Sequence, residues 1–233
     1  MAAGEKLLIN ADMYSPCYVH TGAQPWVESP SRQVLRKRLH LAGGAESGQV
    51  TSLVCYQPGA RFSRHEHPQG EEILVLEGVF SDEHGHWPAG TWLLNPEGFA
   101  HQPYSETGCL LLVKLRQYPG RRQASSQWRE LPLTPRPVHG FPERRLDNHA
   151  GVQTSMLELP AETSLTEYFA GGAEGFVVTG SLSLGATKLT EHDWFRLPPG
   201  ETIYLLSYGC TLYLKSNGVI NLIHEPHPAH EAR

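Results

Sequence analysis

The sequence of 233 residues is poor in cysteine, and its cysteines do not have the spacing of a metal or redox pair. There are four of them and no Cys-x-x-Cys, so a cysteine-based zinc knuckle is not expected. Cys55 and Cys109 lie in apolar stretches that are typical of strands, where a free thiol behaves as a small buried hydrophobic group.

Long apolar runs and basic clusters are also missing. No stretch approaches the ~18 consecutive apolar residues of a membrane helix, and the N-terminal residues lack the cationic start and apolar run of a signal peptide. The net charge is −5 and no basic block is present. We therefore expect a soluble cytoplasmic protein with no membrane and no direct nucleic-acid partner.

What is present is a chain of short strands and turns. Hydrophobic residues make up 39% of the sequence, enough for a packed core, and the 23 glycines and 18 prolines indicate many turns. Strand patterns lie at 34–41, 50–57, 91–94 and 109–115, and the first half shows no amphipathic helix. These patterns predict an all-β protein.

Two histidines and a glutamate in one stretch indicate a metal site. His65 and His67 are two residues apart, so both imidazoles face the same side of a strand. Glu71 follows the turn at 68–70 and can reach the same point, and His101 follows a Pro-Glu-Gly turn that can add a third imidazole. Three imidazoles and a carboxylate suit a first-row transition metal, and we expect one divalent ion of zinc, iron, nickel or manganese.

This arrangement resembles the paired motifs of the cupin superfamily. The motifs G(X)5HXH(X)3E(X)6G and G(X)5PXG(X)2H are matched in order at Gly59, His65, His67, Glu71, Gly78, Gly90, Pro96, Gly98 and His101. Ser105 stands where an Asn usually follows the second motif. More narrowly, the stretch GEEILVLEGVFSDEHGHWPAGTW resembles the ChrR-like cupins, and the resemblance covers residues 26–118. It implies a small antiparallel barrel or jelly roll with metal ligands at His65, His67, Glu71 and His101.

The second half of the sequence repeats the first at an offset of 102 positions. The offset relates Trp26, Glu72, Gly78 and Trp92 to Trp128, Glu174, Gly180 and Trp194. At the four predicted ligand positions the second half has Glu167, Phe169, Ala173 and Ile203, which cannot form the same metal cage. We therefore predict a bicupin of two tandem jelly-roll barrels, the second of them degenerate and metal-free.

The repeat also sets the predicted domain boundaries. We expect a metal-binding cupin domain with an N-terminal lead at 1–119, a polar linker at 120–127 and the degenerate domain at 128–223. The last residues, 224–233, carry histidines flanked by prolines, which forbid a helix, and we expect a disordered tail.

The surroundings of the metal site are less defined by sequence. Arg61, Phe62 and Tyr104 are candidate pocket residues for a small-molecule ligand, and no catalytic residue beyond the metal ligands is assigned. Glu72 points to the opposite face of its strand from Glu71 by the two-residue alternation, so Glu71 is the predicted ligand.

Several functions stay open. The resemblance favours a regulatory or sensor-like ChrR-type cupin. The anti-sigma role of ChrR also needs a zinc-finger domain, which we do not find, so we expect no sigma factor as partner. The alternative is a metal-dependent dioxygenase acting on small diketones or hydroxy-ketones, and a third reading is a metal that only stabilises the barrel. The resemblance also implies a homodimer.

Overall fold

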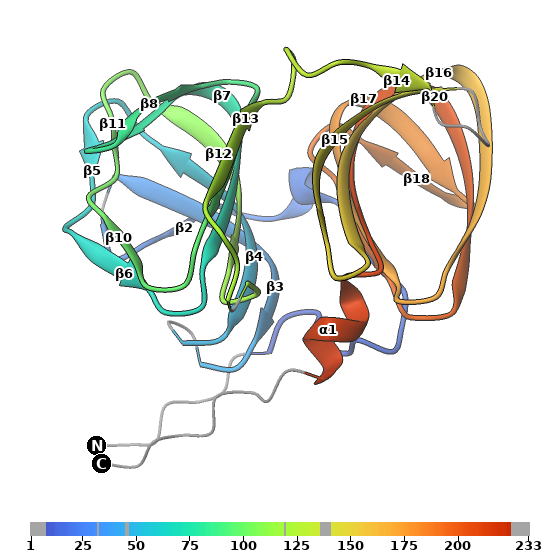
Figure 1. Ribbon diagram of the computed structural model, residues 1–233, viewed down its shortest axis with the longest axis horizontal. Helices are drawn as coiled ribbons and strands as arrows, with labels where there is room; N and C mark the ends of the chain where they lie inside the picture. The colour runs from blue at the N-terminus through green and yellow to red at the C-terminus, as the bar shows by residue number, and fades with distance from the viewer. Residues whose placement is uncertain (1–7, 32, 45–46, 119, 136–140, 225–233) are drawn as a thin grey trace. The chain divides into compact units, whose positions relative to one another are not determined.

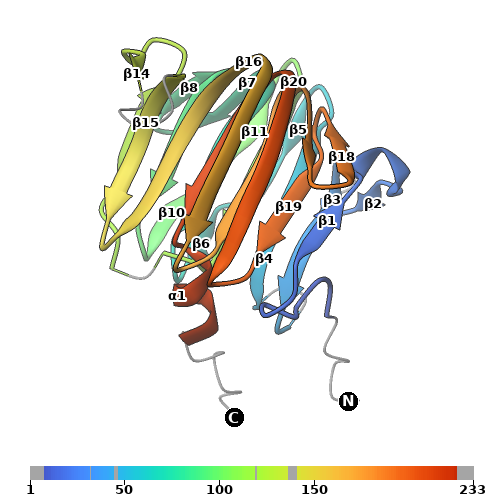
Figure 2. The same ribbon diagram turned by 90° about the vertical axis from the view of Figure 1, so that its right-hand side faces the viewer.

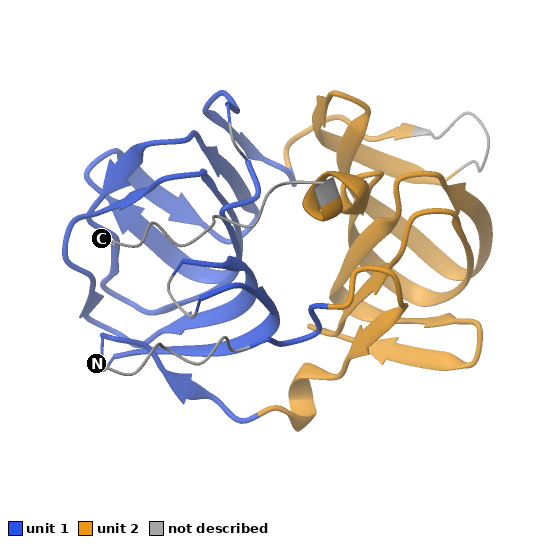
Figure 3. Ribbon diagram, turned by 90° about the horizontal axis from the view of Figure 1, so that it is seen from below, with its two compact units in different colours: residues 1–11, 25–129, 226–233 blue, residues 12–24, 130–225 orange. Residues whose placement is uncertain are grey.

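The chain folds into antiparallel strands that form two compact units (Figure 1, Figure 3). The computed structural model describes residues 8–31, 33–44, 47–118, 120–135 and 141–224. Within these, unit 1 holds residues 8–11 and 25–129, and unit 2 holds residues 12–24 and 130–224. The prediction of an all-β protein of two tandem barrels is confirmed.

Unit 1 is built on one large sheet and a small one. The large sheet has the strand order β13-β9-β7-β12-β4-β3-β2, with β8, β11 and β5 attached beside this path, and β6 pairs with β10 in a separate two-stranded sheet. The strands are β2 (Val27–Glu28), β3 (Val34–Ala42), β4 (Gln49–Tyr56), β5 (Ala60–Arg61), β6 (His65–His67), β7 (Glu71–Asp82), β8 (Gly85–Pro88), β9 (Thr91–Asn95), β10 (Phe99–His101), β11 (Tyr104–Ser105), β12 (Cys109–Leu115) and β13 (Ala124–Gln127).

Unit 2 has a single sheet with the strand order β1-β19-β17-β20-β16-β15-β14, and β18 pairs with β17. Figure 2 shows its long strands β16 and β20 running side by side. Its elements are β1 (Cys17–Val19), the 3-10 helix η1 (Thr21–Ala23), β14 (Thr134–Pro135), β15 (Pro142–His149), β16 (Val152–Phe169), β17 (Ala173–Leu184), β18 (Thr187–Thr190), β19 (Trp194–Leu197), β20 (Glu201–Ser216) and α1 (Val219–His224). In the part of the chain that the structure describes, no helix has the length and apolar character needed to cross a membrane.

The two large sheets have equivalent strand orders, and each begins with a strand from an unexpected part of the chain. β1, from the N-terminal lead, pairs with β19 of unit 2. β13, from the predicted linker, pairs with β9 of unit 1 over four residues. The prediction of a linker at 120–127 is therefore corrected, because the backbone of Ala124–Gln127 extends a sheet. The predicted tail lies outside the described residues from 225 onward.

The repeat seen in the sequence is also present in the strand register. β7 and β17 begin and end 102 positions apart. Gly78 and the equivalent Gly180 both have a positive φ, at 70° and 80°. A Cβ would lie 2.1 Å from a carbonyl oxygen at Gly78 and 2.0 Å from one at Gly180, so both positions require glycine.

The core of unit 1 follows from the alternation of side chains along its strands. Ile73 and Val75 on β7 pack with Leu111 and Val113 of β12 in one buried cluster. Leu74, between them on the other face, is also buried, at 1% exposed. A strand buried on both faces reads as a continuous apolar run, which is why this segment is the clearest strand in the sequence.

Candidate metal centre

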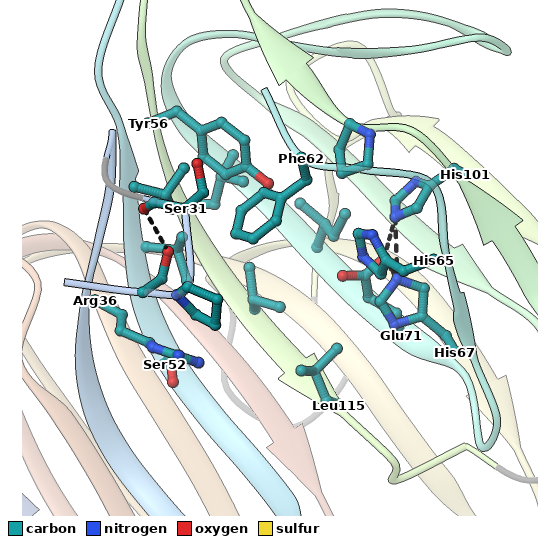
Figure 4. A pocket seen from close by; sticks show the side chains of 18 of the residues that line it. Ser31, Arg36, Ser52, Tyr56, Phe62, His65, His67, Glu71, His101 and Leu115 are labelled. Carbon is teal, nitrogen blue, oxygen red and sulfur yellow. Dashed lines mark hydrogen bonds and ion pairs between the residues drawn. The ribbon is translucent and has the colours of Figure 1, made fainter. Parts of the chain in front are cut away.

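Three short elements bring the predicted ligands together in unit 1. β6 carries His65 and His67, and its antiparallel partner β10 places His101 directly opposite His65. β7 begins at Glu71, after a turn that contains Gly70 at a φ of 75°. A Cβ at Gly70 would lie 2.9 Å from a backbone oxygen, so glycine permits this tight return. Figure 4 shows the three imidazoles and the carboxylate converging.

The ligand atoms have the separations expected around one ion. Nε2 of His67 lies 3.0 Å from Nε2 of His101. Oε2 of Glu71 lies 3.4 Å from the first of these nitrogens and 3.6 Å from the second. One nitrogen from each histidine, His65 included, falls within 4.8 Å of the others. Ligands bound at about 2.0–2.2 Å from an ion are roughly 3.0–3.5 Å apart, so the three histidines fit a transition metal, and Glu71 lies at ligand distance from two of them.

Burial differs among the four side chains. His101 is 1% exposed, His67 is 7% exposed and Glu71 is 6% exposed, whereas His65 lies at the exposed end of β6. A buried carboxylate is costly unless it is paired, and Asn95 donates a hydrogen bond of 3.0 Å from Nδ2 to Oε2 of Glu71. The cluster is therefore closed on the protein side and accessible past His65.

Two hydrogen bonds fix the tautomers of the imidazoles. Nδ1 of His101 donates to Oδ2 of Asp82 at 3.1 Å, and Nδ1 of His65 donates to the backbone oxygen of Ser63 at 2.8 Å. Each bond leaves the Nε2 atom unprotonated and able to bind a metal. The other carboxylate oxygen of Asp82 accepts hydrogen bonds from the backbone N–H groups of His84 and Gly85, which holds it in place.

Asp82 was not predicted as part of the site. In the sequence it reads as the first residue of an Asp-Glu-His-Gly hairpin turn, and its two backbone hydrogen bonds show that it does cap that turn. Its second role depends on the pairing of β6 with β10, which brings His101 beside the end of β7. That contact spans 19 positions and leaves no local pattern.

The site shifts the pKa values of its members in opposite directions. Burial lowers the pKa of His67 below the ordinary value of 6.5, against the raising effect of the Glu71 charge. Burial would also lower the pKa of His101, but the hydrogen bond to Asp82 and the charge of Glu71 outweigh it and raise that pKa. Burial would raise the pKa of Asp82, yet the hydrogen bonds from His101 and from the His84 backbone hold it below its usual value. Burial of His67 therefore favours its neutral form, which is the form that binds a metal.

A cavity of about 630 Å³ opens beside the cluster. Its polar wall includes the four predicted ligands, and its apolar wall includes residues from β4, β7 and β12. The apolar lining residues are Pro30, Val34, Val50, Val54, Tyr56, Phe62, Ile73, Phe80, Pro103, Leu111, Val113 and Leu115. A cavity of this size next to the cluster is large enough for a small organic molecule.

The structure places the three candidate pocket residues differently. Arg61 and Phe62 line the cavity, and the ring of Phe62 packs edge-on against His65 with 5.8 Å between ring centroids. Tyr104 is not among the lining residues. Its ring lies 4.7 Å from the guanidinium of Arg61, which in turn forms an ion pair with Glu106. With Arg61 and Asp82, Tyr104 lines a smaller cavity of about 190 Å³, so its place in a ligand pocket stays a prediction.

Glu72 lies on the opposite face of β7 from Glu71, as the alternation predicts. It is 2% exposed and accepts hydrogen bonds from the indole of Trp92, at 2.7 Å, and from the hydroxyl of Tyr118. In unit 2 the equivalent Glu174 accepts a hydrogen bond of 2.8 Å from Trp194. This pair is a structural feature kept in both copies.

Unit 2 has replaced the metal cluster with apolar packing. Phe169, Ala173 and Ile203, at three of the four equivalent positions, all belong to one buried hydrophobic cluster. The register is retained, because Glu167 pairs with Ile203 as His65 pairs with His101. Leu184 and Leu197, also in that cluster, stand where unit 1 has Asp82 and Asn95. Over the residues that the structure describes, His65, His67 and His101 are the only group of three side chains with metal-ligand spacing.

Comparison with known proteins agrees with this architecture. Residues 15–119 match the family described as the ChrR Cupin-like domain. The chain has the cupin fold. The ChrR-like match is confined to residues 15–119 and includes all four predicted ligands. No curated protein matches the sequence.

Solved structures with the same fold cover most of this chain. A protein from Nostoc punctiforme, assigned provisionally to the dioxygenases, has a TM-score of 0.69 at 13% identity, over 88% of this chain and 84% of its own. The pirin YhhW from Escherichia coli, solved with nickel(II), has a TM-score of 0.65 at 14% identity, over 86% and 98%. A salicylate 1,2-dioxygenase from Pseudaminobacter salicylatoxidans has a TM-score of 0.57 at 18% identity, over 75% and 72%. At these identities the similarity shows the fold alone.

Proposed function

We propose that unit 1 binds one divalent transition metal through His65, His67, Glu71 and His101, and that a small organic molecule binds beside it. The observation that carries the proposal is the cavity of about 630 Å³ into which the ligand cluster opens. A structural metal needs closed coordination and no adjacent space, whereas a catalytic or ligand-binding metal keeps an accessible side. Here the accessible side of the ligand cluster is the side on which His65 lies.

We further propose that the centre is a dioxygenase that acts on small diketones or hydroxy-ketones. A divalent transition metal supplies Lewis acidity and a template for two substrate oxygens. The residues of the chain position that substrate. Glu71 supplies negative charge at the closed end, Phe62 forms an apolar wall next to His65, and the apolar side chains of β4 and β12 exclude water from the remaining volume. The names of two proteins with this fold support the reaction class.

The test is oxygen consumption by protein loaded anaerobically with iron(II). We expect uptake with acetylacetone or with an acyl phenol, and none with the His101→Ala variant. Zinc-loaded protein serves as a second control, because zinc has no redox chemistry. No uptake with any diketone or hydroxy-ketone, in protein shown to contain one iron per chain, would contradict the enzymatic proposal and leave metal binding intact.

A second candidate is a sensor in which metal or ligand binding changes the protein without turnover. It is favoured by the match of residues 15–119 to the ChrR Cupin-like domain. In this case acetylacetone would bind the iron form under oxygen and would be recovered unchanged. Product formation under oxygen would argue against it.

A further inference from the structure

The cavity of unit 1 has a second polar region, away from the metal ligands. It is formed by Arg36 on β3 and Ser52 on β4, both of which line the cavity (Figure 4). Ser52 is 3% exposed, and its Oγ atom is buried without a hydrogen-bond partner among the described residues. A buried hydroxyl that makes no hydrogen bond is destabilising, so its presence in a cavity wall points to a bound group that completes it.

The strand register places the two side chains together. β3 and β4 are antiparallel, with Arg36 paired to Val54 and Arg38 paired to Ser52. Arg36 and Ser52 are therefore diagonal neighbours, a separation that a long side chain such as arginine spans easily. Both face the interior of the cavity.

The same register measures the distance to the metal ligands. Ile73 on β7 pairs with Val113 on β12, which pairs with Ser52 on β4. Ser52 is thus two strands away from the strand that carries Glu71, or about 10 Å at the usual strand spacing. The wall between the two polar regions is apolar and includes Val113 and Leu115.

The charge beside Ser52 favours an anion. Four arginines and two glutamates line it, namely Arg36, Arg61, Arg64, Arg116, Glu66 and Glu71. Two of these arginines form ion pairs at the mouth, Arg61 with Glu106 and Arg64 with Glu83. Arg36 lies in another part of the cavity wall, beside Ser52 (Figure 4).

We propose that Arg36 and Ser52 form a carboxylate-binding subsite, so that the ligand carries a carboxylate at one end and a metal-binding dicarbonyl at the other. A planar guanidinium and one hydroxyl match the two oxygens of a carboxylate, whereas a phosphate would call for more donors. An apolar link of three or four carbons crosses the wall between the two ends. The identity of the dicarbonyl end rests on the function proposed above, and the carboxylate subsite does not.

Calorimetric titration of zinc-loaded protein tests this subsite without turnover of the probe. The probes are 5,7-dioxooctanoate, its methyl ester and acetylacetone. We expect the wild type to bind the acid at least tenfold tighter than the ester. In Arg36→Met this ratio should fall below threefold, and in Ser52→Ala it should fall at least twofold, while the affinity for acetylacetone stays unchanged in both. Arg36→Lys, which keeps the charge, should give an intermediate ratio.

Lys37→Met is the matched control, because Lys37 lies on the same strand but contacts the ring of Trp26 and does not line the cavity. It should keep the wild-type ratio. An equal affinity for acid and ester in the wild type, or an unchanged ratio in folded Arg36→Met and Ser52→Ala, would overturn the proposal.

A titration of metal-free protein separates this result from failure of the metal centre. We expect hexanoate to bind the metal-free wild type at least fivefold tighter than metal-free Arg36→Met. If zinc does not bind at all, the proposed metal function fails, yet a difference in hexanoate affinity still supports the subsite. Equal hexanoate affinities would overturn the subsite whatever the metal content.

Discussion

Asp82 accepts a hydrogen bond from His101, with 3.1 Å between Oδ2 and Nδ1. The bond fixes which nitrogen of the imidazole faces the other ligands. Asp82→Asn removes the charge and keeps the shape, so the metal-binding nitrogen becomes less basic and its tautomer less fixed. We expect metal affinity to fall roughly 10- to 100-fold, measured by competition with a chromophoric chelator. Glu83→Gln, at the next position, should have little effect.

His101→Ala should remove most of the bound metal. The imidazole is 1% exposed and lies within contact of both His67 and Glu71, so no other side chain can take its place. Metal content of protein prepared without a histidine tag and without added metal is the measurement, and it also identifies the ion. The control is His149→Ala, an exposed histidine at the end of β15. Retention of a full equivalent of metal by His101→Ala would contradict the assigned ligand set.

The metal-free protein should lose stability as the pH falls from 7 to 5, in part because of His67. Burial gives this residue a lower pKa in the folded state than in the unfolded state. Below the unfolded pKa of about 6.5, the unfolded chain therefore takes up a proton that the folded chain does not, and the free energy of unfolding decreases.

Urea unfolding at pH 5 and pH 7 measures this effect. His67→Asn should show a smaller decrease than the wild type, whereas His149→Asn should follow the wild type. The raised pKa of His101 acts in the opposite direction, since it contributes stability that is present at low pH and lost as the pH rises through the folded pKa. His149→Asn keeps this contribution unchanged and so controls for it. An identical pH dependence in His67→Asn and the wild type would show that burial of His67 is not the cause.

Cys109 should resist alkylation in the folded protein. Burial raises its pKa to about 12, so at pH 8 only about one thiol in ten thousand is ionised. Cys17 and Cys55 are half-buried and should react first with iodoacetamide. Mass spectrometry of peptides after timed labelling gives the order, and early labelling of Cys109 would show that the sheet opens there.

The metal cluster was predictable because its signals are local. The spacing of His65 and His67, together with the glycine turns that surround them, determines which way those side chains point. The second motif then predicts the strand that pairs with theirs, and β10 does pair with β6. The repeat was also predictable, because the same residue types recur 102 positions apart. The offset reappears in the structure, where Glu167 pairs with Ile203.

The parts that were not predicted depend on pairing between distant segments. A polar stretch such as 124–127 resembles a linker, because an edge strand needs only backbone hydrogen bonds and leaves no apolar pattern. Likewise, nothing in the sequence of Cys17–Val19 indicates its partner β19, which lies about 180 positions further along.

The exchange of β1 and β13 has a consequence for the ancestry of the two copies. Each barrel takes its outermost strand from the stretch of chain that precedes the other, so neither can be inherited or produced alone without an uncovered edge. A gene break near position 119 would damage both barrels at once. This shared dependence explains how a copy that has lost every metal ligand can be retained: it completes the fold of the copy that kept them.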